Sequence, residues 1–149
     1  RYDAVPGSQL REPLLNQNLS QENESMPSKA VELYKHYAKA WSAISDQERR
    51  TILDSVLETE IIYRIPRMEG TGRQIVIDDI TGFQAKCPGG QFALHSVSEH
   101  HDVALMEWQL ILPDGTPGVR GHDAIRVTPE GKLGQIVTFA PSTLEPQAS

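Results

Sequence analysis

Residues 119–140 read VRGHDAIRVTPEGKLGQIVTFA, and this stretch decides the predicted fold. Two apolar, β-rich runs flank the segment from Pro129 to Lys132, and a glycine after an acidic residue between such runs is typical of a β-hairpin turn. One acid, Asp123, lies inside the first run. A carboxylate in a strand that otherwise looks buried is destabilising unless it has a partner or a function. We therefore take Asp123 as the first candidate functional residue.

The hydrophobic period of the chain changes near residue 90. Before that point, apolar residues spaced three and four apart predict three helices, with a short β-rich run over 60–65 between the second and the third. The first helix covers about 27–43, the second begins at the capping box Ser45-Asp46-Gln47-Glu48, and the third follows the loop Gly70-Thr71-Gly72. After residue 90, alternating patterns predict strands over 92–98, 103–112 and 119–128, ahead of the strand that follows Gly131. This order predicts an α+β fold with helices packed in the concave face of a curved antiparallel sheet.

Length and composition narrow the class of protein. The chain has 149 residues and a formal net charge of −6, which fits one globular domain and does not favour nucleic acid as a partner. No apolar stretch is long enough to cross a bilayer, so we expect no membrane partner. The single cysteine, Cys87, excludes an internal disulfide and fits a reducing compartment, so we expect a cytoplasmic protein. The composition predicts a polar tail or arm over 1–25, one domain over 26–141 and a C-terminal tail over 142–149.

The predicted turns decide which side of each strand faces the helices. The strand over 103–112 has a wholly apolar face made of Ala104, Met106, Trp108, Leu110 and Leu112. Tight turns at Asp114-Gly115 and Glu130-Gly131 place Asp123 on that face, on the same side as Ile136, Thr138 and Ala140. The outer face then carries Glu107, Gln109, Arg120, His122 and Arg126. A turn near His100 places His95 on the buried face beside Met106.

The candidate residues have structural interpretations as well as functional ones. Asp123 is either a proton-transfer group in an apolar pocket, where burial raises its pKa, or a partly exposed strand acid paired with an arginine. Tyr34, Tyr37 and Trp41 form an aromatic stripe that is either core or pocket wall, and the same alternatives hold for Tyr63. The acidic pairs Asp78-Asp79 and Asp46-Glu48 are interpreted as solvated helix surface.

The histidines and the cysteine give weaker functional signals. His95 is either a base or an exposed strand histidine. His100 and His101 are adjacent, but neighbouring strand residues point to opposite faces, so we expect no metal site. Cys87 is interpreted as a small buried hydrophobe, because no basic neighbour in the sequence activates its thiol.

Three segments resemble the SnoaL-like proteins of the nuclear transport factor 2-like superfamily. They are YKHYAKAW at 34–41, GTGRQIVIDDITGF at 70–83 and GHDAIRVTPEGKLGQIVTF at 121–139, and the resemblance covers about residues 25–140. This superfamily also contains ketosteroid isomerases, scytalone dehydratases and limonene epoxide hydrolases. The resemblance implies a cone-shaped, half-open barrel with a deep apolar pocket, and many members are homodimers.

The resemblance also implies roles for particular residues. Asp123 matches the acid that donates a hydrogen bond to an oxyanion in ketosteroid isomerases and serves as the base in SnoaL-like cyclases. Tyr37 is the best match for the isomerases' phenol donor in the first helix, with Tyr34 as its rival. The isomerases' base would fall near Tyr63, where this sequence has no Asp or Glu. His95, with Tyr37 or Tyr63, could imitate the His–Tyr arrangement of scytalone dehydratases.

We therefore expect a cofactor-free enzyme that acts on a small, largely apolar molecule by acid–base chemistry, of isomerase, cyclase, dehydratase or epoxide hydrolase type. The predicted catalytic residues are Asp123, Tyr37 and His95. The predicted pocket wall is made of Tyr34, Trp41, Tyr63, Met106, Trp108, Ile125, Ile136 and Thr138. We expect no cofactor and no metal, and a homodimer formed through the outer sheet face. The alternatives are a protein that binds a hydrophobic ligand without chemistry, and a dimeric interaction module of the same fold.

Overall fold

The computed structural model describes residues 27–142. The tail predicted over 1–25 and nearly all of the one predicted over 142–149 lie outside the described residues. The described helices are α2 (Lys29–Lys39), α3 (Asp46–Val56) and α4 (Arg73–Lys86). The strands are β1 (Leu57–Ile65), β2 (Met68–Thr71), β3 (Gln91–His100), β4 (Val103–Ile111), β5 (Pro117–Val127) and β6 (Leu133–Phe139).

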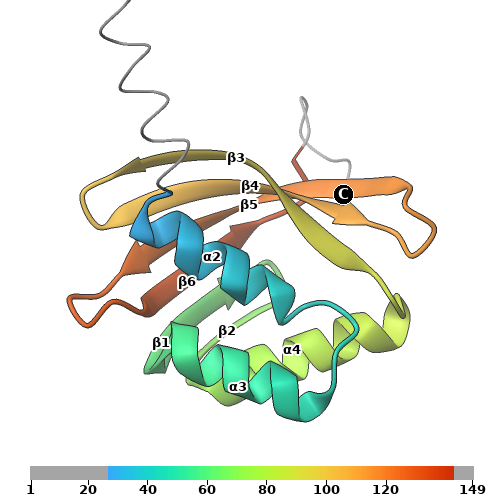
Figure 1. Cartoon of the computed structure of the whole chain (residues 1–149), viewed down its shortest axis with the longest axis horizontal. Coiled ribbons are helices and arrows are strands. Elements are labelled where there is room, and N and C mark those ends of the chain that lie inside the picture. The colour runs from blue at the N-terminus through green and yellow to red at the C-terminus, as the bar shows by residue number, and fades with distance from the viewer. Residues whose placement is uncertain (1–26, 143–149) are drawn as a thin grey trace, which may run out of the picture.

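The strands form one curved sheet in the order β2-β1-β6-β5-β4-β3. Figure 1 shows α2 across the concave side of this sheet, with α3 and α4 below it beside β1 and β2. Over residues 27–142 the sheet does not close on itself, so the described chain has the predicted α+β, cone-shaped half-barrel architecture. All neighbouring strands are antiparallel except β1 and β6, which are parallel. The sheet is therefore mixed, because β1 precedes the antiparallel meander of β3 to β6 and lies beside its last strand.

Local sequence explains where the helices begin. The hydroxyl of Ser28 accepts a hydrogen bond from the backbone N–H of Val31 at the start of α2. The predicted capping box of α3 is confirmed, since Ser45 and Glu48 each accept a hydrogen bond from the other's backbone N–H. Gly70 and Thr71, predicted to lie in a loop, belong to the short strand β2, which pairs with β1.

The predicted register of Asp123 is confirmed on both sides. Asp123 pairs with Met106 on β4 and with Thr138 on β6. Gly115 and Gly131 lie in the two turns and have positive φ angles of 89° and 81°, a conformation that glycine adopts without strain. The turn chemistry therefore places the carboxyl of Asp123 on the side of the sheet that faces the helices.

The predicted burial of His95 is wrong. Leu94 pairs with Trp108 and Ser96 with Glu107, so β3 has one extra residue between them. A β-bulge of this kind shifts the alternation of faces by one residue. His95 is consequently exposed to solvent.

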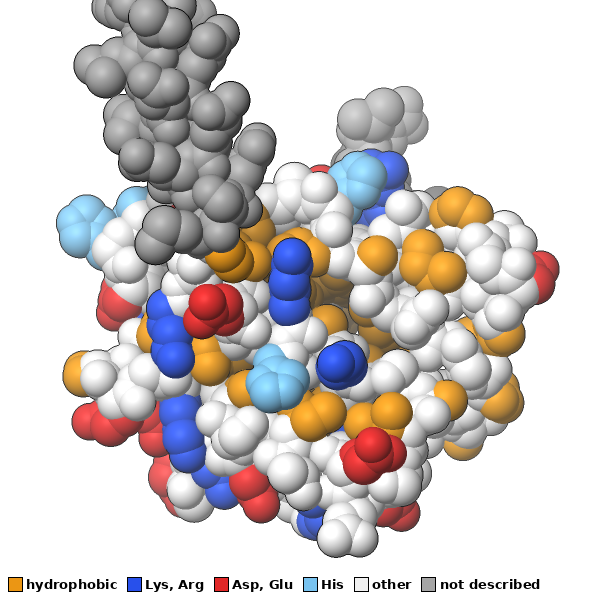
Figure 2. Space-filling model, viewed as in Figure 1, with side chains coloured by type: hydrophobic (Ala, Val, Ile, Leu, Met, Phe, Trp, Pro, Cys, Tyr) orange, Lys and Arg blue, Asp and Glu red, His pale blue; other side chains and the backbone are white. Residues whose placement is uncertain are grey.

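Among the helices that the structure describes, none is long and apolar enough to cross a membrane. On the face shown in Figure 2, basic and acidic side chains are intermingled, and neither charge forms an extended patch.

Candidate active site

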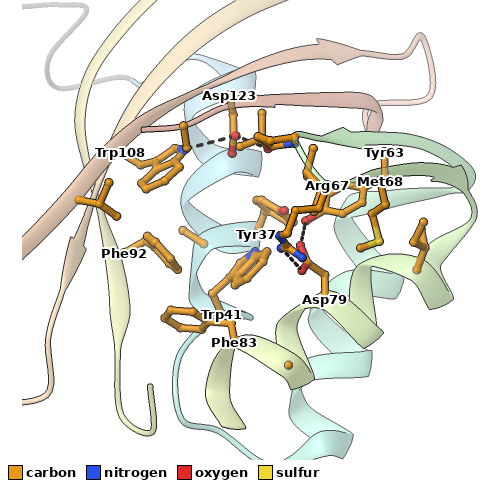
Figure 3. A pocket seen from close by; sticks show the side chains of 18 of the residues that line it. Tyr37, Trp41, Tyr63, Arg67, Met68, Asp79, Phe83, Phe92, Trp108 and Asp123 are labelled. Atoms are coloured by element: carbon orange, nitrogen blue, oxygen red, sulfur yellow. Dashed lines mark hydrogen bonds and ion pairs between the residues drawn. The ribbon is translucent and has the colours of Figure 1, made fainter. Parts of the chain in front are cut away.

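A cavity of about 850 Å³ lies between the helices and the concave side of the sheet. Its lining comes from α2, α4, the β1–β2 hairpin and the inner faces of β3 to β6. Both tryptophans of the chain, Trp41 and Trp108, belong to this lining. Most of the wall is apolar, and the polar groups gather at two places, one around Asp123 and one around Asp79 (Figure 3).

Asp123 is the polar centre of the sheet side of the cavity, where it is only 5% exposed. Its Oδ2 accepts a hydrogen bond from the Tyr34 hydroxyl at 2.7 Å. Its Oδ1 accepts one from the Thr138 hydroxyl at 2.7 Å and one from the Trp108 indole N–H at 3.2 Å. The donors come from α2, β6 and β4, so three elements fix one carboxyl group. Within the described residues no lysine or arginine forms an ion pair with it, so the interpretation of Asp123 as a surface acid paired with an arginine is wrong.

The environment of Asp123 favours proton exchange. Burial raises the pKa of Asp123 above its ordinary value, and the hydrogen bonds from Tyr34, Thr138 and Trp108 oppose this rise only in part. A carboxyl with a raised pKa exchanges its proton closer to neutral pH, which is what acid–base chemistry requires. A carboxylate oxygen has two lone pairs, and those of Oδ1 are both occupied by Trp108 and Thr138. Oδ2 accepts only the Tyr34 bond among the described residues, so it is the oxygen that can take up or release a proton.

The phenol that contacts Asp123 is Tyr34, not Tyr37, which the sequence analysis placed nearest in role. Both side chains are 3% exposed and their ring centroids lie 5.7 Å apart, but Tyr37 lies one helical turn further along α2. Burial raises the pKa of Tyr37, and the negative charges of Asp123 and Asp79 raise it further. Tyr37 therefore stays protonated and can donate a hydrogen bond to a ligand. The hydroxyl of Tyr34 already uses its hydrogen bond on Asp123.

A second polar group, which the sequence analysis missed, surrounds Asp79 on α4. The hydroxyl of Tyr63 donates to Asp79 Oδ2 at 2.6 Å, and Nη2 of Arg67 donates to Oδ1 at 3.0 Å. The Asp79 side chain is 9% exposed, so its interpretation as solvated helix surface is wrong, whereas Asp78 is exposed as expected. Helical spacing could have revealed it, because Asp79 lies three residues after Val76 and four before Phe83 on the apolar stripe of α4.

Aromatic rings form much of the remaining cavity wall. Trp41 contacts Phe83 and Phe92 at centroid distances of 5.6 Å and 5.5 Å, and Phe92 contacts Trp108 at 5.1 Å. These edge-on contacts are the arrangement that aromatic rings prefer in a packed interior.

Five of the eight residues predicted for the pocket wall line the cavity: Tyr34, Trp41, Tyr63, Trp108 and Thr138. Met106, Ile125 and Ile136 do not line it; they are at most 2% exposed and belong to the core behind the wall. Of the three predicted catalytic residues, the cavity brings together Asp123 and Tyr37, and His95 lies outside its lining.

Gly121 determines the position of the Trp108 indole. The two residues pair across β5 and β4, and a Cβ atom at residue 121 would lie 2.3 Å from Trp108 Cζ2. Gly121→Ala is expected to displace the indole, to break its hydrogen bond to Asp123 and to destabilise the fold by about 1–3 kcal/mol. The carboxyl titration of Asp123 followed by NMR should then show a pKa higher than in the wild type. Gly82→Ala is the control, because a Cβ atom there meets no atom of the described residues within 4 Å. An unshifted pKa in Gly121→Ala would contradict the prediction.

Comparison with known proteins supports the resemblance through structure. No protein-family model matches the sequence, and no curated protein matches it either. The structure is similar to that of a candidate isomerase of the SnoaL-like family from Agrobacterium tumefaciens, with a TM-score of 0.68, 27% identity and coverage of 74% of this chain and 96% of that one. An NTF2-like protein of unknown function from Exiguobacterium matches with a TM-score of 0.61 at 18% identity, over 74% of this chain and 99% of that one.

A third solved structure is a candidate SnoaL-like polyketide cyclase from Jannaschia, which matches with a TM-score of 0.61 at 13% identity. The match covers 74% of this chain and 84% of that one. These three solved structures are SnoaL-like and NTF2-like proteins, one of them a candidate isomerase and one a candidate polyketide cyclase. The resemblance predicted from the three sequence segments is confirmed, and the chain has the SnoaL-like fold of the nuclear transport factor 2-like superfamily.

Proposed function

We propose that the protein is a cofactor-free enzyme that transfers protons on a small, largely apolar molecule bound in the cavity. The reaction is of isomerase, cyclase, dehydratase or epoxide hydrolase type. The observation that carries the proposal is the buried carboxyl of Asp123 at the wall of an apolar cavity. This carboxyl accepts three hydrogen bonds and has a raised pKa. The names given to similar structures, a candidate isomerase and a candidate polyketide cyclase, support the same class of chemistry.

The geometry of Asp123 assigns a part to each neighbour. When ionised, its Oδ2 accepts a proton from the substrate, while Trp108 and Thr138 hold Oδ1 and keep the carboxyl orientation fixed. When protonated, Oδ2 returns the proton or donates a hydrogen bond to a substrate oxygen. Tyr37 supplies a phenol that can stabilise negative charge developing on that oxygen.

The proposal is tested by incubating the protein with three groups of compounds: unsaturated ketones, epoxides and poly-β-ketones. Proton NMR in D₂O detects conversion, and it also detects deuterium uptake next to a carbonyl when no net reaction occurs. We expect one group to be converted or exchanged by the wild type and not by Asp123→Asn. Conversion that is unchanged in Asp123→Asn would overturn the proposal.

A second candidate function is binding of a hydrophobic ligand without chemistry. The observation in its favour is that the hydroxyls of Tyr34 and Tyr63 both donate hydrogen bonds to carboxyl groups of the protein. Fewer hydrogen-bond donors are then left for a substrate. Tight binding of an apolar compound, with neither conversion nor exchange across all three groups, would favour this alternative.

The pKa of Asp123 discriminates between the two tyrosines of α2. Tyr34→Phe is expected to raise the pKa of Asp123 above the wild-type value, because the Tyr34 bond is the strongest of the interactions that lower it. Tyr37→Phe should change it less, since among the described residues Tyr37 makes no side-chain hydrogen bond to Asp123. Carboxyl titration by NMR measures both. A larger shift in Tyr37→Phe than in Tyr34→Phe would contradict the assignment.

We also propose a homodimer through the outer face of the sheet. Beside the predicted polar residues, this face exposes Val103, Leu105 and Phe139, which are 37%, 43% and 58% exposed. Leu105→Glu with Phe139→Glu is expected to reduce the mass measured by light scattering from a dimer to a monomer, because the new charges would be buried against each other. Val119→Glu is the control, since Val119 is 44% exposed but lies on the cavity side. A wild-type monomer would refute this proposal.

A further inference from the structure

The group around Asp79 lies apart from Asp123, with Tyr37 between the two in Figure 3. We propose that Arg67 and Asp79, supported by Tyr63, bind a hydroxyl group of the ligand, so that the ligand carries an oxygen function at each end. This inference rests on the proposed use of the cavity and adds a second binding site to it. The two sites together select a flat, conjugated or aromatic molecule with oxygen atoms at opposite ends.

The hydrogen-bonding capacity of this group fits a hydroxyl. Each oxygen of Asp79 receives one hydrogen bond from the described residues and keeps a lone pair for another donor. Arg67 makes one side-chain hydrogen bond within the described part of the chain, so most of its N–H groups remain available to an acceptor. A ligand hydroxyl can donate to Asp79 and accept from Arg67 at the same time. Tyr63 holds the Asp79 carboxyl in place through the hydrogen bond that its hydroxyl donates.

The β1–β2 hairpin contains a second ion pair, with which the Arg67–Asp79 pair can be compared. The Arg64–Glu69 pair joins β1 and β2 at 3.1 Å, and both side chains are well exposed, at 58% and 71%. In the Arg67–Asp79 pair the arginine is 69% exposed but the carboxylate only 9%, at 3.0 Å. A pair of exposed charges contributes little to stability and faces water. The largely covered carboxylate of Asp79 instead lies in the cavity wall, with Arg67 in the β1–β2 turn between Ile65 and Met68.

The aromatic wall of the cavity determines the rest of the ligand. Trp108 contacts Phe92, and the rings of Phe92, Trp41 and Phe83 contact one another, so the four rings form one continuous aromatic surface of the cavity. Flat rings and conjugated systems pack on such a surface better than bulky saturated groups, because aromatic contacts add to the area that is buried. Trp108 donates to Asp123, and Phe83 lies about one helical turn after Asp79 on α4, so a molecule lying along these rings extends from one polar site to the other.

The test uses three pairs of probes of increasing length, each a diol and its mono-hydroxy analogue. They are hydroquinone with phenol, 2,6-dihydroxynaphthalene with 2-naphthol, and 4,4′-dihydroxybiphenyl with 4-phenylphenol. Quenching of tryptophan fluorescence reports binding, because both tryptophans of the chain line the cavity. For the pair whose length fits, we expect the diol to bind about tenfold more tightly than the mono-hydroxy analogue, which corresponds to ~1.4 kcal/mol.

Arg67→Leu is expected to abolish that difference, so that diol and analogue bind alike. Arg64→Leu is the matched control, because it removes another well-exposed arginine and its ion pair outside the cavity lining, and it should preserve the difference. Asp79→Asn, which keeps the shape of the side chain, should weaken binding of the diol more than binding of the analogue. The inference is overturned if no pair shows the difference, or if the difference survives Arg67→Leu. Since the measurement needs no turnover, its failure is distinct from a failure of catalysis, which Asp123→Asn tests.

Discussion

Replacing Asp123 by asparagine is expected to reduce turnover strongly and, above the pH range in which Asp123 ionises, to stabilise the fold. The two effects have one cause, because the group that exchanges protons is also a buried acid whose charged form is disfavoured. Removal of a general acid or base reduces the rate by about 10²–10⁴-fold. The assay is kcat/KM for a compound that the wild type converts.

The expected stabilisation follows from the direction of the pKa shift. The pKa of Asp123 in the folded protein is raised above its ordinary value of 3.8, so the folded state binds the proton more tightly than the unfolded chain. The stabilising contribution of the protonated carboxyl is therefore fully present below the unfolded pKa and is lost as pH rises through the folded pKa. Asparagine is neutral at every pH and lacks this loss. Thermal unfolding measured at increasing pH across the acid range should show the melting temperature of the wild type falling relative to that of Asp123→Asn.

The asparagine amide fits the same three partners. Its carbonyl oxygen can accept the bonds from Trp108 and Thr138, and its NH₂ group can donate to the Tyr34 hydroxyl, which then accepts instead of donating. Asp102→Asn is the control, because Asp102 is an exposed acid outside the cavity lining and its replacement should alter neither activity nor the pH profile. If Asp123→Asn lost stability equally at all pH values and kept activity, Asp123 would be a structural acid.

The sequence was sufficient to place Asp123 because turn chemistry and alternation determine register. Two turns with glycine at positive φ flank β5, and each residue of the strand then has a fixed face. The choice between Tyr34 and Tyr37 could not be made in the same way. They are three residues apart on one face of α2, and the packing of that helix against β5 decides which one reaches the carboxyl.

Other features depend on contacts that leave little local signal. The bulge that exposes His95 inserts one residue in β3 without a glycine or proline to mark it. The parallel pairing of β1 with β6 joins segments far apart in the chain, so no hairpin turn in the sequence predicts it. Asp79 did carry a signal, its place on the apolar stripe of α4, but its neighbour Asp78 made the pair look like a solvated surface.

Arg49 is another feature that the sequence analysis missed, and its loss should have the largest effect on stability. Arg49 is a charged residue, yet it lies on the buried face of α3 with Leu53 and Val56 and is only 5% exposed. Its Nε donates to the carbonyl of Ala40 at 2.8 Å, and its Nη2 donates to those of Ser42 and Ile44 at 3.0 Å and 3.2 Å. The guanidinium therefore satisfies the carbonyls of the segment that joins α2 to α3.

Arg49→Ala is expected to lower the free energy of unfolding by about 3–5 kcal/mol, because it leaves several buried or half-buried carbonyl oxygens without a donor. Arg49→Lys should recover little of this loss, since an ammonium group lacks the planar fork that reaches three carbonyls at once. Urea unfolding measures both. The neighbouring Arg50→Ala is the control, because Arg50 is exposed and its removal should change the free energy by no more than about 0.5 kcal/mol. Equal effects of Arg49→Ala and Arg50→Ala would show that the connection holds its shape without the guanidinium.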